Sequence, residues 1–214
     1  MPERYPGYDV LAKRHTPSWN EATRRAIDRR LALPRGPRFF TEAEWAVLDA
    51  LCACIVPQPR NRPPIPTAAL VDNKLYSGDG DGYRHAKLPP MGEAWRRGLA
   101  AFDAEAQRRF GRNFAALQPF EQDFLLRHAE AGDLDDPAWG DMPPDLFFEH
   151  RALHDVTQAY YSHPTAWNEI GFGGPASPRG YVRMGFDRRD PWEAAEARND
   201  DEAEAARREN RRVG

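Results

Sequence analysis

The chain has 214 residues, of which 41% are hydrophobic and 11% aromatic, and its formal net charge is −3. This apolar content is enough for a packed core, so we expect a folded domain and exclude a fully disordered polymer. A near-neutral charge gives no field that would hold nucleic acid or an anionic membrane, and we expect neither as a partner. No apolar run approaches the roughly 20 residues that span a bilayer, so direct membrane insertion is not expected.

Residues 1–37 are mostly polar and predict an extended N-terminal arm that contains one short helix. Ser18 and Glu21 match a capping box, which would begin a helix that ends near Leu31. The Pro-Arg-Gly-Pro sequence at 34–37 predicts a hinge before the core.

A helical core domain is expected over residues 38–186. Thr41 and Glu44 form a second capping box, and Pro57 ends the helical apolar pattern that follows them. Later helices are predicted at 67–76, 91–110, 119–131 and 143–161. Gly111 and Gly132 suit the C-terminal ends of two of these helices. Because no alternating strand pattern occurs, the sequence predicts an all-α fold, an irregular helical bundle.

The C-terminal part of the chain changes character after Pro164. Residues 167–183 combine glycines, prolines and large aromatics, which predicts an ordered irregular loop. Asp141, upstream, is the expected N-cap of the helix over 143–161. The charged tail, 187–214, has helix propensity but no apolar stripe, so alone it should be frayed.

Two histidines raise the possibility of a metal site. His150 and His154 are four residues apart on one predicted helix, a spacing that lets two imidazoles share a metal ion. With His128 upstream, Asp155 and the downstream Asp187, they loosely resemble the ligand order of the all-α HD phosphohydrolases. The competing interpretation is that these histidines are surface or capping residues that share a helix face.

Other reactive side chains have simpler explanations. Asp79 and Asp81 begin like a calcium loop, but the later ligand positions do not fit, so a flexible acidic turn is expected. Cys52 and Cys54 lie on a predicted core helix, where buried thiols are inert. The sequence therefore contains no complete catalytic constellation, and we expect no catalytic, cofactor-binding or metal-binding residue.

Aromatic residues held on a rigid loop are typical of a protein-binding surface, because they bury much area at little entropic cost. We therefore predict a partner interface in the segment from Tyr160 to Phe186. Its members are Tyr160, Tyr161, His163, Pro164, Trp167, Gly171, Phe172, Gly173, Gly174, Pro175, Arg179 and Tyr181.

Four motifs in this order resemble the gluconate 2-dehydrogenase subunit 3 family. They are Phe-Phe-Thr-Glu-Ala-Glu at 39–44, Gly-Leu-Ala-Ala-Phe-Asp at 98–103, Tyr-Tyr-Ser-His-Pro at 160–164, and Gly-Gly-Pro-Ala-Ser-Pro-Arg-Gly-Tyr at 173–181. Phe102 stands where the family usually has leucine. The resemblance covers roughly the expected core domain and leaves the arm and the tail outside.

The resemblance implies a small, non-catalytic subunit of a glucose-methanol-choline oxidoreductase complex that oxidises sugars, sugar acids or polyols. In such complexes the large partner holds the FAD and the catalytic histidine, and the small subunit binds, stabilises or matures it. Exported family members often carry a twin-arginine signal, whereas this sequence begins with a polar arm. A cytoplasmic complex is therefore expected, with periplasmic co-export alongside a partner as the alternative.

The rival functions are an HD-type metal-dependent hydrolase using His128, His154 and Asp155, and a stand-alone helical interaction or chaperone module.

Overall fold

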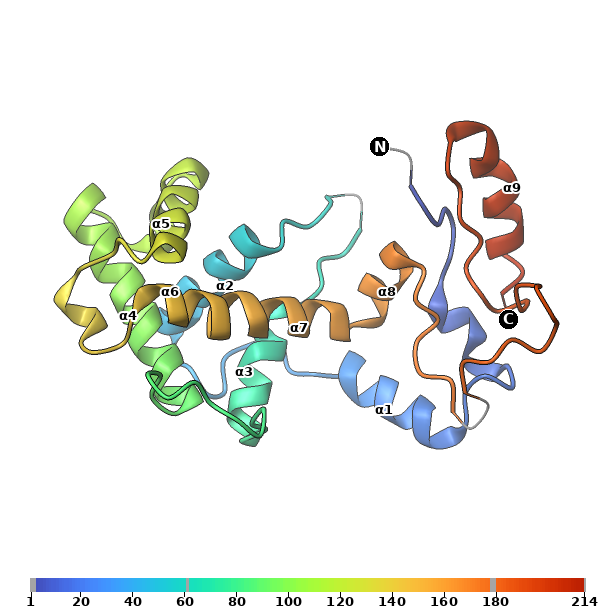
Figure 1. Ribbon diagram of the computed structural model, residues 1–214, viewed down its shortest axis with the longest axis horizontal. Helices are drawn as coiled ribbons and strands as arrows, with labels where there is room; N and C mark the ends of the chain where they lie inside the picture. The colour runs from blue at the N-terminus through green and yellow to red at the C-terminus, as the bar shows by residue number, and fades with distance from the viewer. Residues whose placement is uncertain (1–2, 61, 178–179, 214) are drawn as a thin grey trace. The chain divides into compact units, whose positions relative to one another are not determined.

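The computed structural model describes residues 3–60, 62–177 and 180–213 (Figure 1). Contacts divide the chain into two compact units: unit 1 contains residues 1–32 and 161–214, and unit 2 contains residues 33–160. The described residues form helices and no β-strand, which confirms the expected all-α fold. In this described part of the chain, no helix combines the length and apolar character needed to cross a membrane.

Unit 2 is built from helices and the turns and loops that join them. Its elements are α2 (Glu42–Ile55), α3 (Thr67–Ser77), α4 (Met91–Phe110), the 3₁₀ turn η2 (Phe114–Ala116), α5 (Pro119–Ala131), the 3₁₀ turn η3 (Pro137–Trp139), α6 (Pro144–Phe147), the π-helix η4 (Phe148–Leu153) and the start of α7 (His154–Ser162). In Figure 1 the chain continues from α6 into α7 as one helical rod. The long helices lie close to their predicted positions because each carries an apolar stripe.

The core of unit 2 is a cluster of aromatic rings. Phe102 lies 5.4 Å from Phe114 and 5.6 Å from Trp139, measured between ring centroids, and Trp95 lies 5.5 Å from Phe147. Phe102, in the motif at 98–103, thus contributes to this cluster. The Phe102–Trp139 and Trp95–Phe147 pairs meet edge-to-face, an arrangement that adds stabilisation beyond the area that the rings bury.

Gly98 explains why a glycine occurs in the middle of α4. A Cβ atom at this position would collide with the ring of Phe147, which lies directly against the α4 backbone. Asp103, five residues later, accepts a hydrogen bond from the backbone N–H of Phe114 at 2.8 Å. The motif at 98–103 therefore fixes how α4 contacts the helices and turns that follow it.

Three of the helix ends predicted from local sequence signals occur in the structure. The capping box is present: Glu44 N donates to Thr41 Oγ1 at 3.3 Å, and Thr41 N donates to Glu44 Oε2 at 2.8 Å. Gly111 and Gly132 both adopt left-handed conformations at helix C-termini, with φ of 68° and 74°. These three expectations are confirmed.

Two predicted N-caps were wrong. Ser18 is fully buried, and α1 (Glu21–Leu31) is instead capped by Asn20, whose side chain accepts from Thr23 N at 2.9 Å. Asp141 does not cap α6, because Pro143 occupies the N-cap position, and the Asp141 carboxylate pairs with Arg97.

Unit 1 brings together segments from both ends of the chain. It contains η1 (Val10–His15), α1, the end of α7, α8 (Pro164–Ile170) and α9 (Asp200–Asn210). Val10 N donates to the Asn168 side chain at 2.8 Å, and Asn20 N donates to Ser177 O at 2.9 Å. The N-terminal residues are therefore packed into a folded unit and do not form the extended arm that we expected. Their apolar side chains Val10 and Trp19 are buried with Trp167.

The charged tail also differs from the expectation that it would fray. The buried side chain of Asn210 donates to Pro6 O and Ala195 O at 3.0 Å each and accepts from Ala195 N at 2.6 Å. Ala197 N donates to Arg4 O at 2.8 Å, so the two ends of the chain lie side by side (Figure 1). The boundaries expected at 37/38 and 186/187 thus differ from those drawn by contacts, at 32/33 and 160/161.

Candidate functional site

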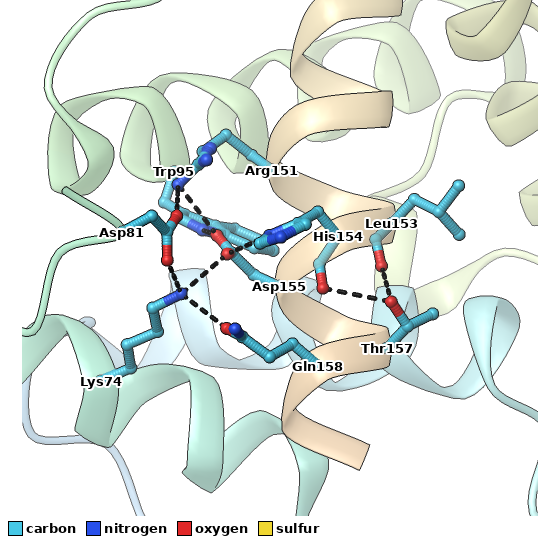
Figure 2. A network of polar contacts seen from close by, with 9 residues as sticks. All are labelled: Lys74, Asp81, Trp95, Arg151, Leu153, His154, Asp155, Thr157 and Gln158. Atoms are coloured by element: carbon cyan, nitrogen blue, oxygen red, sulfur yellow. Dashed lines mark hydrogen bonds and ion pairs between the residues drawn. The ribbon is translucent and has the colours of Figure 1, made fainter. Parts of the chain in front are cut away.

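A buried network of charged side chains occupies the middle of unit 2 (Figure 2). Asp155, from the first turn of α7, accepts from the Trp95 indole at 2.8 Å and from Lys74 Nζ at 3.1 Å. Asp81 accepts from Lys74 Nζ at 2.6 Å and from Arg151 at 3.0 Å. Arg151 also lies 3.5 Å from Asp155. Two carboxylates and two cations therefore compensate each other inside the fold.

The charges of this network alter the ionisation of Asp81. Burial by itself would raise the pKa of Asp81, but hydrogen bonds and charges from Lys74 and Arg151 outweigh burial and hold the pKa below its ordinary value. Asp81 therefore stays ionised and fixes the 78–82 loop to α3 and η4. The expectation of a flexible acidic turn was wrong at this residue.

Asp81, His154 and Asp155 also have the spacing of a metal site. One donor atom from each lies within 4.8 Å of the others. However, the facing carboxylate oxygens already bind Lys74 and Arg151. A metal ion would have to displace two cations from a site where both carboxylates are already compensated. The arrangement is better suited to holding the fold together than to coordinating a metal.

The ligand set expected of an HD hydrolase is not assembled in unit 2. His128 Nδ1 lies 3.6 Å from Asp133, and His150 stacks on His85 with ring centroids 5.2 Å apart. Neither joins the three-residue group around His154 among the residues that the structure describes. The π-helix η4 contributes, because its wider turn changes the 3.6-residue spacing that would place His150 and His154 on one face.

The two cysteines behave as core residues. Cys52 is buried, and burial raises the pKa of its thiol. Cys54 is half-buried, contacts the Gln122 side-chain oxygen at 3.3 Å, and its pKa is also raised by burial. Both thiols are therefore poor nucleophiles at neutral pH.

Part of the predicted interface is used for internal packing. The Trp167 indole is buried and donates to Tyr161 O at 2.6 Å, and His163 Nδ1 accepts from Thr165 N at 3.2 Å at the start of α8. Pro164 is buried beside them at the first position of α8. Tyr160, in unit 2, is buried and accepts from Arg62 at 2.8 Å.

The glycines of the segment allow close packing of aromatic rings. Gly171 ends α8 with φ of 66°, and a Cβ there would collide with the Tyr5 ring. Gly174, also at φ of 66°, lies against the rings of Trp167 and Trp19. Gly173 accepts a hydrogen bond from Lys13 through its carbonyl oxygen. Pro175 is half-buried, and Arg179 lies outside the described residues.

The remaining predicted residues, Tyr161, Phe172 and Tyr181, are exposed, and further exposed apolar residues lie in the same segment of the chain. Phe172 stacks on Tyr181 with centroids 6.4 Å apart and meets Trp167 edge-on at 5.6 Å. We use the name aromatic patch for the exposed large apolar residues of the segment 161–186, which are Tyr161, Ile170, Phe172, Tyr181, Val182, Met184 and Phe186. A cavity of about 330 Å³ lies beside it, lined in part by Tyr5, Phe172, Tyr181, Arg183 and Trp192.

Four members of the aromatic patch were missing from the sequence-based list: Ile170, Val182, Met184 and Phe186. The signal that could have found the last three is the alternation of Val182, Met184 and Phe186 with Arg183 and Gly185, next to a glycine-rich segment. Ile170 was missed because α8 was expected to be an irregular loop from Trp167 onward, whereas its helix ends at Ile170.

Comparison with known proteins points to one family. The family model described as gluconate 2-dehydrogenase subunit 3 matches residues 42–174, which is more than half of the chain. No curated protein and no solved structure matches. The matched region includes the buried network, α8 and the first part of the glycine-rich segment. The chain belongs to the gluconate 2-dehydrogenase subunit 3 family, as its sequence motifs indicated.

Proposed function

We propose that this chain is the small, non-catalytic subunit of an FAD-dependent dehydrogenase complex of the glucose-methanol-choline type. The large partner subunit would hold the FAD and oxidise a sugar, sugar acid or polyol. The family name supports a subunit role, since it describes one component of a dehydrogenase. The role of the chain is then to bind the large subunit and to stabilise or mature it, in the compartment where that subunit functions.

The aromatic patch is the observation that carries this proposal. Large apolar side chains that lie together on the surface mark interaction sites, and the contact between Phe172 and Tyr181 brings two of them together. Phe172 and Tyr181 stack on each other above the buried Trp167, so the patch has a rigid base. A rigid aromatic surface loses little conformational entropy when a partner covers it.

The candidate catalytic groups support the same view. His154 and Asp155 belong to the compensated ion network, and Cys52 is buried with a raised pKa. Each of these groups has a structural role or is shielded from solvent. These structural roles are compatible with a subunit that performs no catalysis itself.

The test is co-purification with a defined partner. The tagged chain would be co-expressed with a large glucose-methanol-choline flavoprotein encoded in the same genome, and the purified material examined for flavin absorbance. We expect a stoichiometric complex that carries flavin. A double variant, Phe172→Ser with Tyr181→Ser, should lose the flavoprotein while unit 2 stays folded. Recovery of the wild-type chain alone, folded and monomeric, would overturn the proposal.

A further inference from the structure

Residues 5–20, which we call the N-terminal strap, lie across a surface that the family region of the chain provides. Val10 N donates to the Asn168 side chain at 2.8 Å. The strap lies outside the matched residues 42–174, whereas α8 and residues 171–174 lie inside them. A segment from outside the family region therefore covers a surface that belongs to it.

The covered surface, which we call the strap seat, consists of Trp167, Asn168, Gly171, Gly173 and Gly174. A Cβ atom at Gly174 would lie 2.9 Å from the Trp167 ring and 3.2 Å from the Trp19 ring of the strap. Lys13 donates to the carbonyl oxygen of Gly173. Glycines leave room for such rings because they have no side chain. The strap seat is therefore shaped to receive an aromatic ring and a hydrogen-bond donor.

The strap is seated at a cost in free energy. Ser18 Oγ and Trp19 Nε1 are buried, and neither has a hydrogen-bond partner among the residues that the structure describes. Lys13 is 2% exposed, so its ammonium group is withdrawn from water. A cavity of about 330 Å³ is lined by Tyr5 and Lys13 of the strap and by Gly171 of the strap seat, so the packing there is incomplete. Buried polar groups without partners regain hydrogen bonds in water, which favours release of the strap.

The strap seat borders the residues on which we place the partner. The Trp167 ring meets the exposed Phe172 ring edge-on, with centroids 5.6 Å apart. The Asn210 side chain donates to Pro6 O at 3.0 Å, and this bond joins the strap to the C-terminal tail and not to the strap seat. It therefore does not oppose movement of the strap away from Trp167. A partner bound at Phe172 is next to a surface that release of the strap would open.

We propose that the N-terminal strap is an autoinhibitory contact, which occupies the strap seat in the free chain and is displaced by the large dehydrogenase subunit when the complex forms. The incoming segment of the large subunit carries an aromatic ring in place of Trp19 and a donor for Gly173 O. This inference rests on the proposed function and deepens it, because it adds a second, covered part to the same interface. The apparent affinity then depends on the fraction of chains whose strap is open.

The experiment follows amide hydrogen exchange in the full-length chain, free and in complex with the purified large flavoprotein subunit. Residues 9–20 should exchange roughly tenfold faster or more in the complex, because displacement frees backbone donors such as Val10 N. Residues 164–174 should stay protected, because the large subunit takes the place of the strap. The helix α2, in unit 2, is the internal reference and should exchange at the same rate in both samples.

Two strap variants should change the affinity for the large subunit in opposite directions. Ser18→Ala replaces the buried hydroxyl with a methyl group, stabilises the closed strap and should weaken binding by roughly fivefold. Trp19→Ala removes the ring that lies against Gly174, favours the open strap and should strengthen binding by roughly tenfold. Ala22→Ser, at an exposed position of α1, is the control and should leave the affinity unchanged. Circular dichroism checks that each variant is folded.

The outcomes separate the inference from the proposed function. If the wild-type chain binds the flavoprotein while residues 9–20 exchange at an equal or slower rate in the complex, the strap is a permanent part of the fold. The autoinhibition inference is then wrong and the proposed function stands. The same holds if Ser18→Ala binds within twofold of wild type and Trp19→Ala binds more weakly. If the wild-type chain does not bind the flavoprotein, both fail.

Discussion

The Trp95 indole donates its N–H to Asp155 Oδ2 at 2.8 Å, in the buried interior of unit 2. This bond joins the aromatic core to the ion network, because Trp95 also packs edge-on against Phe147. Asp155 thus satisfies a buried donor and balances the charges of Lys74 and Arg151 at once (Figure 2). We therefore regard Asp155 as a structural centre of unit 2.

Replacing this carboxylate should destabilise unit 2 strongly. Asp155→Ala would leave Lys74 and Arg151 with one carboxylate between them and the Trp95 N–H unpaired. The expected loss is about 3–5 kcal/mol in the free energy of unfolding, the range for breaking a buried ion pair. Urea denaturation followed by tryptophan fluorescence measures it.

Two further variants make this prediction specific. Asp155→Asn keeps an acceptor for Trp95, so its loss should be smaller than that of Asp155→Ala. Asp123→Ala removes an exposed partner of Arg127 and should change stability by less than about 0.5 kcal/mol. Equal stabilities of Asp155→Ala and Asp123→Ala would mean that the network contributes nothing.

The network should also make stability depend on pH in the acidic range. The pKa of Asp81 is lowered from 3.8 in the folded state, so its contribution is complete above the unfolded pKa and is lost as pH falls through the folded one. The difference in unfolding free energy between wild type and Asp81→Asn should be constant near neutral pH and shrink below about pH 4. Denaturant titrations over this range measure it, and a difference that grows on acidification would contradict the sign.

Close packing at Gly98 predicts that adding a methyl group at this position destabilises unit 2. Gly98→Ala places a methyl group against the Phe147 ring inside a dense core, so we expect a loss of about 1–3 kcal/mol despite the better helix propensity of alanine. Gly36→Ala is the matched control, because nothing lies within 4 Å of a Cβ atom there. Equal stability of both variants in thermal denaturation would contradict the claim that the Phe147 ring leaves no room for a methyl group at position 98.

Asn210 should determine whether the C-terminal tail stays folded. Asn210→Ala leaves the buried N–H of Ala195 without its acceptor and removes the donors to Pro6 O and Ala195 O, a cost of about 1–3 kcal/mol per unsatisfied group. We expect faster trypsin cleavage after the arginines of α9 and faster amide exchange in unit 1. Glu204→Ala, on the exposed face of α9, should cleave at the wild-type rate. Similar protection in the two variants would show that Asn210 does not hold the tail.

Features encoded by neighbouring residues could be predicted from the sequence. The capping box at Thr41 and the left-handed glycines at 111 and 132 depend on residues within one helical turn, and all three were correct. The helix α8 was missed because Trp167 was assigned to the loop that follows, although His163 and Pro164 provide an N-cap and a first turn. The π-helix was missed because an apolar stripe specifies a helix without specifying one wider turn.

Features that depend on distant residues could not be predicted. The partners of the N-terminal segment lie far along the chain, since Val10 N bonds to the side chain of Asn168. No local pattern near Val10 signals that contact, so the segment was expected to be extended. The ion network has the same origin, because Lys74 and Asp155 come from different helices.

The candidate surface could be predicted from the sequence only in part. The composition of the 160–186 segment drew attention to its aromatics, but it could not separate those that pack inside, such as Trp167, from those that stay exposed, such as Tyr181. That separation requires the fold, because Trp167 is covered by residues from the N-terminal segment.

The central claim is that this chain supplies a docking surface and leaves the chemistry to a flavoprotein subunit. The most direct measurement compares sugar- or polyol-dependent dye reduction by the isolated chain, the isolated large subunit and their equimolar mixture, with flavin content determined in each. We predict no turnover and no flavin in the isolated chain, and a flavin-containing complex with higher or longer-lived activity in the mixture. Turnover or firmly bound flavin in the isolated chain would contradict the account.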